Sequence, residues 1–278
     1  MAIFPTDRPY RSRLVVTGAA GIVGTLLRGK LDHLADEVVL SDLEDVEVSG
    51  NEVSRPCDVT DMDAVRELLR GGGDVLHFGG QSVEAPFERI LQANLVGAYN
   101  VYEAARLEGV RRVLFPSSNH AIGFHTRETK LDGDSPTRPD SLYGVSKVYG
   151  EALARFYYDK FGMESLVVRI GSCFPEPKDE RMLATWMSAD DMVRLIERMI
   201  RAPRLGCPTV YGVSANAELW WDNSHADYLG WTPQDTSEPW REEKVAAERP
   251  DPQDPLVRFH GGAFTAQPHP GTRMDGGE

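Results

Sequence analysis

The chain has 278 residues, of which 41% are hydrophobic and 26% are charged. This length and balance are typical of a globular protein with a sizeable core, and they exclude a disordered chain, a fibrous repeat and a disulfide-rich scaffold. With 43 acidic against 30 basic residues, the net charge is −13. An acidic chain is repelled by phosphate backbones, so we expect no nucleic-acid partner.

Short apolar runs alternate with helical patterns along the chain. Strands are predicted over residues 13–17, 37–42, 53–57, 74–80, 110–118, 165–172 and 208–214. Helices are predicted over residues 22–34, 61–70, 90–105, 142–162 and 189–202. This alternation predicts an α/β fold with a doubly wound parallel sheet. Four apolar residues near the C-terminus predict a final segment that docks on the body: Leu256, Val257, Phe259 and Phe264.

Targeting and metal signals are absent from the sequence. The N-terminal residues lack the apolar core of a signal peptide, and no window approaches the roughly 18 apolar residues of a membrane span. Cys57, Cys173 and Cys207 are widely spaced and share no zinc pattern with the histidines. We therefore expect reduced thiols, a cytoplasmic location, no membrane partner and no metal.

A glycine-rich motif, TGAAGIVG, lies between the first strand and the first helix and contains Gly18, Gly21 and Gly24. Glycines permit a tight turn and a close approach of the backbone to a pyrophosphate, beside the free N–H groups of the helix start. The alternative is a plain strand-to-helix turn. The position between a strand and a helix favours dinucleotide binding in a Rossmann fold.

Asp42 ends the second strand, 24 residues after Gly18. A carboxylate at this spacing hydrogen-bonds the adenosine ribose diol and repels a 2′-phosphate. The next residues, Leu43, Glu44 and Asp45, offer no cation for such a phosphate. The sequence thus predicts NAD rather than NADP, against the alternative of an exposed turn acid.

Tyr143 and Lys147 lie four residues apart in a predicted helix, and Ser118 ends a strand 25 residues earlier. Side chains at this helical spacing share one face. An ammonium near a phenol stabilises the phenolate and lowers the phenol pKa, which would make Tyr143 a usable base. The pattern YxxxK is common by chance. It indicates a catalytic pair here because the glycine motif precedes it and Ser118 ends a nearby strand.

These motifs together resemble the extended short-chain dehydrogenase/reductase superfamily. The strings PSSNHAIG, RPDSLYGVSKVYGE, RIGSCFPEP, RMLATW and GCPTVYGVSAN resemble its uronate dehydrogenase family, from about Arg13 to about Phe264. The resemblance implies NAD-dependent oxidation of C1 of D-glucuronate or D-galacturonate to an aldarolactone. It also implies a homo-oligomer.

The resemblance assigns roles to individual residues. Tyr143 would be the base, Lys147 would bind the nicotinamide ribose, and Ser118 would hold the reacting oxygen. Asn94 would support the lysine through water, and Arg181 would bind the substrate carboxylate with both arms of its guanidinium. The implied substrate residues are Ser82, Ser118, Asn119, His120, Tyr143, Ser172 and Arg181. The implied cofactor residues are Gly18, Gly21, Ile22, Val23, Gly24, Asp42, Leu43, Asp58, Val59, Phe78, Gly79, Gly80, Asn94, Tyr143, Lys147 and Ile170. One departure from the family pattern is Gln81, which stands where an apolar residue precedes Ser82.

The expected organisation has four parts. They are an N-terminal extension (1–12), an NAD-binding core with the catalytic residues (13–172), a substrate-side lobe interleaved with the core (173–265) and a disordered tail (266–278). We interpret His77 as a core histidine, Cys173 as a packing residue, and Trp220 and Trp221 as packing of the lobe.

Two rival functions remain. A nucleotide-sugar epimerase or dehydratase shares the glycine motif and the Tyr/Lys pair, but it needs a larger C-terminal lobe and cations for two phosphates. A non-catalytic dinucleotide sensor would not need Tyr143, Lys147 and Ser118 together.

Overall fold

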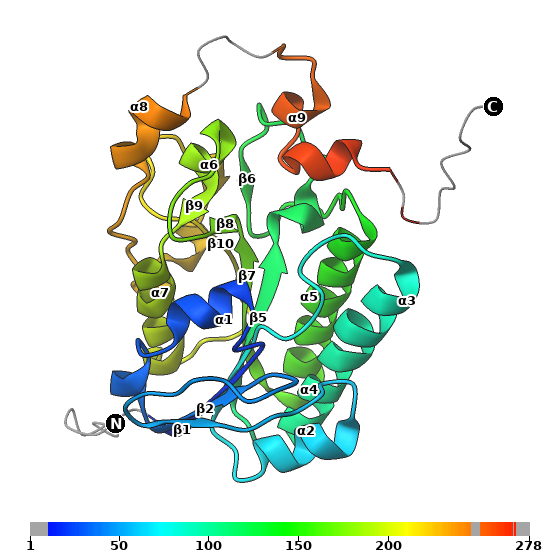
Figure 1. Cartoon of the computed structure of the whole chain (residues 1–278), viewed down its shortest axis with the longest axis vertical. Coiled ribbons are helices and arrows are strands. Elements are labelled where there is room, and N and C mark those ends of the chain that lie inside the picture. The colour runs from blue at the N-terminus through cyan, green and yellow to red at the C-terminus, as the bar shows by residue number, and fades with distance from the viewer. Residues whose placement is uncertain (1–10, 246–250, 269, 271–278) are drawn as a thin grey trace.

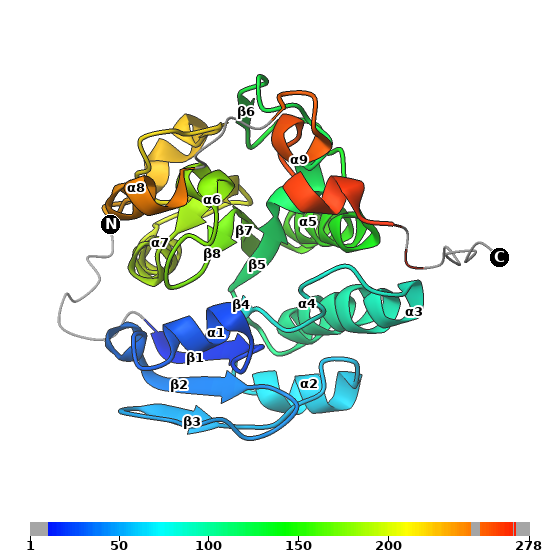
Figure 2. The same ribbon diagram turned by 45° about the horizontal axis from the view of Figure 1, so that its top comes forward.

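Seven parallel strands form the central sheet of the protein, in the order β10-β7-β5-β4-β1-β2-β3 (Figures 1 and 2). The computed structural model describes residues 11–245, 251–268 and 270. The strands of this sheet are β1 (Arg11–Thr17), β2 (Ala35–Ser41), β3 (Glu52–Ser54), β4 (Asp74–His77), β5 (Arg112–Ser118), β7 (Glu164–Ile170) and β10 (Thr209–Gly212). The predicted doubly wound parallel sheet is confirmed.

Helices cover both faces of the sheet, which is why the strands are apolar on both sides. Leu14 and Val16 of β1 pack in one core cluster with α1 and α7, while Val15 packs in another with α2, α4 and α5. The main helices are α1 (Ile22–Leu27), α2 (Met62–Leu69), α3 (Phe87–Ile90), α4 (Gly97–Leu107), α5 (Leu142–Phe161) and α7 (Ala189–Arg201). A π-helical turn, η2 (Leu91–Val96), joins α3 to α4.

The first helix is shorter than the sequence predicts. The apolar pattern predicted a helix over residues 22–34, but α1 ends at Leu27 and a 3₁₀ turn, η1 (Asp32–Leu34), follows. Gly29 adopts a φ of 71°, which interrupts the helix. Leu31 and Leu34 are still buried, so the apolar pattern reports their burial and not a continuous helix.

Short elements beyond the carboxyl ends of the sheet build a small lobe. Two pairs of short strands belong to it, β6 (Leu131–Asp132) with β11 (Trp221–Asp222) and β8 (Ser172–Cys173) with β9 (Trp186–Met187). Its helical pieces are η3 (Asn119–Ile122), α6 (Glu180–Thr185), η4 (Ser224–Leu229), η5 (Glu238–Trp240), α8 (Arg241–Lys244), α9 (Pro255–Arg258) and η6 (Gly262–Ala266). Because β6 precedes residue 173, the lobe draws on chain from both sides of the predicted boundary.

The C-terminal segment docks on this lobe as predicted. Phe259 forms a β-bridge with Thr126, and the His260 N–H donates to the His125 carbonyl at 3.0 Å. The predicted extension 1–12 and tail 266–278 lie outside the described residues except for 11, 12, 266–268 and 270. Arg11 already belongs to β1. In the described ranges, no helix combines the length and the apolar character needed to span a membrane.

Candidate active site

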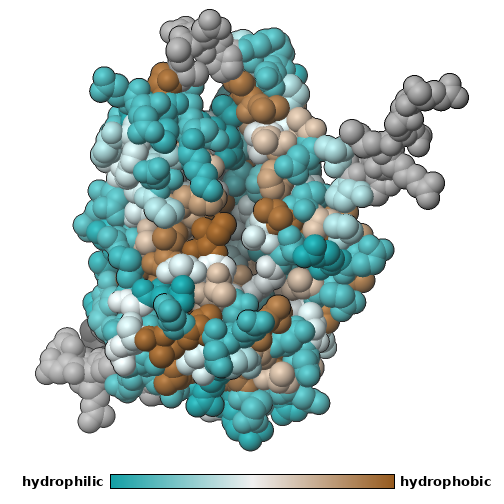
Figure 3. Space-filling model, in the orientation of Figure 1, coloured by the Kyte–Doolittle hydropathy of each residue, from teal (hydrophilic) through white to brown (hydrophobic). Residues whose placement is uncertain are grey.

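A cleft opens where the strand order reverses between β1 and β4, the usual place for a nucleotide in an open α/β sheet. The face of the molecule in Figure 3 is hollowed between the side that carries α1 and α7 and the side that carries α3 and α5. The cleft has a volume of about 570 Å³. Its lining includes the predicted cofactor residues Gly18, Gly21, Asp42, Leu43, Asp58, Val59, Phe78, Gly79 and Gly80.

The glycine loop is built for close backbone approach. Gly18 has a φ of 73°, and a Cβ there would lie 2.4 Å from the carbonyl carbon of Phe78. A Cβ at Gly24 would lie 2.3 Å from the Gly18 carbonyl oxygen. Ile22 and Val23 begin α1, where the first N–H groups have no intrahelical acceptor. This tight cradle beside free backbone donors fits a dinucleotide pyrophosphate.

Asp42 is held at the rim of the same cleft. Its carboxylate accepts hydrogen bonds from the backbone N–H of Ala20 at 2.9 Å and of Leu43 at 2.8 Å. The bond from Ala20 ties the end of β2 to the glycine loop, and the bond from Leu43 fixes the carboxylate against its own backbone. The carboxylate is thus fixed where the sequence places the ribose diol.

The proposed catalytic residues converge from α5 and β5. Tyr143 and Ser118 are both buried, and the Ser118 side chain lies close enough to the phenol to affect its pKa. The Lys147 ammonium lies 5.4 Å from the centres of both the Tyr143 and Phe115 rings. Lys147 therefore shares the predicted face of the helix with Tyr143.

The protein alone does not lower the Tyr143 pKa as the sequence predicts. Burial raises the pKa of Tyr143 to about 12, and the Ser118 side chain offsets only part of this rise. Burial also lowers the pKa of Lys147 to about 8. The low-polarity surroundings thus disfavour the charged form of both side chains, and Lys147 is not among the groups that shift the Tyr143 pKa.

His120 lies between Tyr143 and the C-terminal segment. Its Nδ1 lies 2.8 Å from an oxygen of the buried Asp140 carboxylate, so Nδ1 carries a proton and Nε2 is the free ring nitrogen. The ring stacks on Phe264 at 3.8 Å between centroids and lies 5.8 Å from the Tyr143 ring. His120 is thus oriented within reach of a substrate at Tyr143.

Arg181 is a cation in a poorly hydrated place. Burial and repulsion from Arg127 lower its pKa to about 10. Its Nε and Nη2 donate to the His260 carbonyl at 3.2 and 2.5 Å. No carboxylate among the described residues forms an ion pair with it. An anionic ligand would offset the cost of holding this charge.

Asn119 joins Arg181 to the strand end that carries Ile170. With its amide oriented to satisfy its neighbours, Asn119 accepts from Arg181 Nη2 at 2.7 Å and donates to the carbonyls of Ile170 and Gly171, both at 3.2 Å. Nη1 of Arg181 is then the nitrogen left for a ligand. The predicted two-armed contact with a carboxylate requires Asn119 or His260 to release a hydrogen bond.

The remaining predicted residues, Ser172, Ser82 and Asn94, differ in their exposure and in their hydrogen-bond partners. Ser172 is buried, and its hydroxyl bonds that of Thr185 at 2.9 Å, one turn from Arg181. Ser82 is exposed on the loop after β4. The Asn94 amide bonds both backbone groups of Gln81 and donates to Ser146 Oγ at 2.8 Å. Asn94 therefore anchors the Ser82 loop directly to α5.

The residues interpreted from the sequence as core or packing residues are buried. His77 is buried, and its Nδ1 lies 2.8 Å from Thr17 Oγ1, while burial lowers its pKa to about 3. Burial raises the pKa of the Cys173 thiol to about 12. Trp220 and Trp221 pack in the apolar cluster of the lobe. Within the described ranges, no group of three or more His, Cys, Asp or Glu side chains is arranged to hold a metal.

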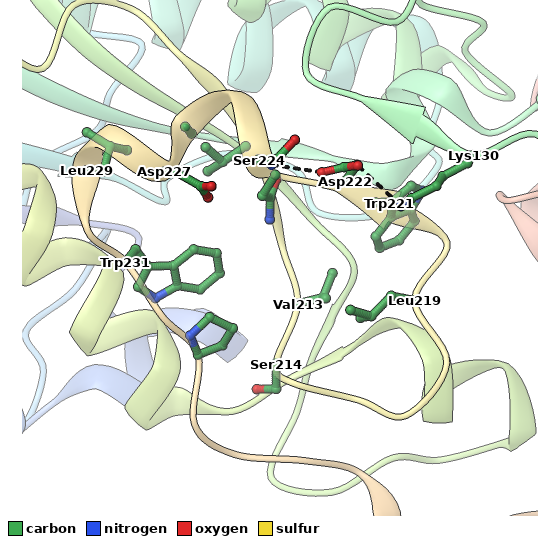
Figure 4. Close-up of a pocket in the computed structure, with 14 residues that line it drawn as sticks. Lys130, Val213, Ser214, Leu219, Trp221, Asp222, Ser224, Asp227, Leu229 and Trp231 are labelled. Carbon is green, nitrogen blue, oxygen red and sulfur yellow. Dashed lines mark hydrogen bonds and ion pairs between the residues drawn. The ribbon is translucent and has the colours of Figure 1, made fainter.

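A second cavity of about 340 Å³ lies in the lobe and shares no lining residue with the cofactor cleft (Figure 4). Trp221, Leu219 and Trp231 line it, and Lys130 pairs with Asp222 at its edge at 3.2 Å. None of the predicted site residues borders it. The predicted site residues thus lie at the cleft and around Tyr143 and not at this cavity.

Three site residues were not predicted from the sequence. Phe264 stacks on His120, the His260 carbonyl holds Arg181, and Glu84 binds the start of α5. Phe264 carried a weak signal as an apolar residue near the C-terminus. The sequence carried no indication of the other two, because each acts on residues at least 58 positions away in the chain.

Comparison with known proteins places this arrangement in a family. Residues 14–185 match the NAD dependent epimerase/dehydratase family, and the chain belongs to it. This membership confirms the predicted fold and NAD as the cofactor.

Individual relatives cover nearly the whole chain. Uronate dehydrogenase of Agrobacterium fabrum is 52% identical over 258 residues, 92% of this chain and 97% of the relative. The crystal structure of glucuronic acid dehydrogenase from Chromohalobacter salexigens is 54% identical, with a TM-score of 0.91 over 94% of this chain and 98% of that one. A tyrosine-to-alanine mutant of the uronate dehydrogenase from Agrobacterium tumefaciens, solved with NAD, is 51% identical, with a TM-score of 0.88 over 92% and 98% of the two chains.

Proposed function

We propose that the chain is an NAD-dependent uronate dehydrogenase that oxidises C1 of D-glucuronate or D-galacturonate to the aldarolactone. The observation that carries this proposal is Arg181, a poorly hydrated cation without an ionic partner in the described ranges, which Asn119 holds next to the end of the strand that carries Ser118. A uronate differs from a neutral hexose by one carboxylate, and Arg181 supplies the matching charge. The similar proteins named uronate and glucuronic acid dehydrogenases support the same substrate class.

The residues divide the work of the reaction. Oxidation removes a proton from the C1 hydroxyl and a hydride from C1, which leaves a C1 carbonyl. Tyr143 accepts the proton, Ser118 holds the reacting oxygen, and His120 orients the sugar hydroxyls. Asn119, proposed from the sequence for the same task, is buried and holds Arg181 in place instead. The glycine loop and Asp42 would hold NAD⁺ in the cleft, where it would supply the acceptor for the hydride. Burial of Tyr143 excludes water from the reacting oxygen.

Turnover with a substrate panel tests this proposal. Purified protein is mixed with NAD⁺ and with uronates, neutral aldoses and nucleotide sugars, and NADH absorbance is followed. We expect NADH to accumulate with galacturonate or glucuronate. An epimerase or dehydratase would return its NAD and accumulate no NADH, so nucleotide-sugar conversion without NADH would establish the rival function.

Asp42 sets the expected cofactor preference. Because its carboxylate stands at the cleft rim, Asp42→Ala removes the charge that repels a 2′-phosphate. The variant should use NADP⁺ better relative to NAD⁺ than the wild type does, as measured by kcat/KM for each cofactor. Equal use of both cofactors by the wild type would reject this role.

We also propose that the enzyme is a cytoplasmic homo-oligomer. The three cysteines are buried free thiols, in keeping with a reducing compartment. Large apolar side chains are exposed on α4 and α5, among them Tyr99, Val145, Phe156 and Phe161. A second copy of the chain would cover them.

A further inference from the structure

The start of α5, the helix that carries Tyr143, has every early N–H group occupied. Ser141 accepts from the Gly144 N–H through its hydroxyl and from the Val145 N–H through its carbonyl, both at 2.9 Å. The two groups before these, the N–H of Leu142 and of Tyr143, donate to the Glu84 carboxylate at 3.1 and 2.8 Å. The catalytic tyrosine is thus bonded through its own backbone to a residue 59 positions away.

Glu84 belongs to the loop between β4 and α3, which also carries Gly80 and Ser82. The same loop is fixed to α5 a second time, because Asn94 bonds the Gln81 backbone and Ser146 of α5. Ala85 packs in one apolar cluster with Tyr143. The loop therefore contacts the first turn of α5 through Glu84 and Ala85, and a second link to α5 runs through Asn94.

We propose that Glu84 is a positioning residue that sets the place of Tyr143 relative to the cofactor cleft and the substrate loop. This inference rests on the proposed function. The two hydrogen bonds fix the backbone from which the phenol projects, and a base must lie within about 3 Å of the proton it takes. Small displacements of such a group slow the chemical step far more than they weaken binding.

An ordinary helix cap is the competing explanation, and the chain provides a matched control. Asp61 caps α2 by the same chemistry, since its carboxylate accepts from the N–H of Asp63 at 2.9 Å and of Ala64 at 3.1 Å. Helix α2 carries no proposed catalytic residue. Asp61→Ala therefore measures what the loss of a carboxylate cap does to this protein in general.

The experiment compares Glu84→Ala, Glu84→Gln and Asp61→Ala with the wild type. We expect Glu84→Ala to lower kcat for galacturonate by roughly 10- to 100-fold while Kd for NADH stays within about twofold. Glu84→Gln keeps one acceptor oxygen, so its kcat should fall less than that of Glu84→Ala. With C1-deuterated galacturonate, the isotope effect on kcat should be larger in the Glu84 variants than in the wild type, because hydride transfer has become slower. Asp61→Ala should lower Tm and leave kcat unchanged.

The inference is overturned if Glu84→Gln and Glu84→Ala lower Tm as Asp61→Ala does but keep kcat and the isotope effect of the wild type. If Glu84→Ala does not fold, Glu84→Gln decides by the same two readouts. Wild-type turnover is measured first. Its absence with uronates would reject the proposed substrate instead, and the Glu84 comparison would then use the sugar in the panel that the wild type oxidises.

Discussion

Tyr143 is the residue on which the proposed chemistry depends most. Tyr143→Phe removes the proton acceptor and keeps the ring, so turnover should fall by roughly 10²- to 10⁴-fold while NAD binding survives. Because burial raises the pKa of Tyr143 to about 12, the phenol form dominates at neutral pH in the protein alone. The wild-type rate should therefore increase with pH as more phenolate forms. Steady-state rates and NADH titration of both proteins check this, and near-wild-type turnover by the variant would remove Tyr143 from the mechanism.

Arg181 tests the substrate class. Arg181→Ala should cost about 2–4 kcal/mol of transition-state binding for galacturonate, as expected for loss of a charge-assisted pair. Galactose, a poor substrate without the carboxylate, should be almost unaffected. Arg181→Lys should recover only part of the lost transition-state binding of galacturonate, because an ammonium cannot reproduce the planar donors of a guanidinium.

The measurement is kcat/KM for both sugars in the wild type and each variant. Because Arg181 also holds the His260 carbonyl, its loss can loosen the C-terminal segment. That structural effect would lower kcat/KM for both sugars by the same factor. An equal fall would make Arg181 a structural residue and require another cation for the carboxylate.

Residue roles separate into those that local sequence predicts and those that it cannot. Tyr143, Lys147 and Gly18 were predictable, since helical spacing and a glycine between strand and helix are local patterns. Glu84 and the His260 carbonyl act on residues 59 and 79 positions away, and nothing in their neighbourhoods marks the partner. The direction of the Tyr143 pKa was also missed, because burial is a property of the packed molecule.

At the scale of elements, β5 and α7 are joined by one buried arginine. Arg112 donates to the last carbonyls of α7, at 2.6 Å to Met199, 2.9 Å to Ile200 and 2.6 Å to Ala202. Its Nε donates to the Glu164 carboxylate at 2.9 Å. Arg112→Met should lower the free energy of unfolding by about 3–5 kcal/mol, because it leaves the carbonyls at the end of α7 without their donor and removes one of the charged partners of Glu164.

The same substitution should change the pH dependence of stability. Burial by itself raises the pKa of Glu164, but hydrogen bonds from the Gly206 N–H and from Arg112 outweigh it and hold the pKa below its ordinary value. A carboxyl group with a lowered pKa in the folded state stabilises the fold above its unfolded pKa, and this is lost as pH falls. Urea unfolding at neutral and acidic pH should thus show a smaller acid dependence in Arg112→Met. Arg70→Met, which removes the exposed pair with Glu67, is the control and should change little.

At the scale of the whole molecule, the alternation of apolar runs and helical patterns was sufficient to predict the sheet and its main helices. The same pattern wrongly predicted a continuous helix through Leu31 and Leu34, because these residues are buried by tertiary packing and not on the face of a longer helix. The small elements of the lobe were not predicted, because two-residue strands such as β6 and β11 exist only by pairing across 90 residues. Their positions follow from the sheet beneath them and not from their own composition.

Assembly is the remaining property of the whole molecule, and it is testable on one surface. Phe156 and Phe161 of α5 are 47% and 45% exposed, and Tyr99 of the neighbouring α4 is 45% exposed. Burial of these rings by a second copy should stabilise a homo-oligomer at micromolar concentration. Phe156→Glu places a charge in that contact and should shift the protein toward monomers in sedimentation velocity. Tyr228→Glu, at a 61% exposed position in η4, is the control and should not. A wild type that sediments as a monomer, or a Phe156→Glu variant that keeps its oligomeric state, would show that this surface is not the contact.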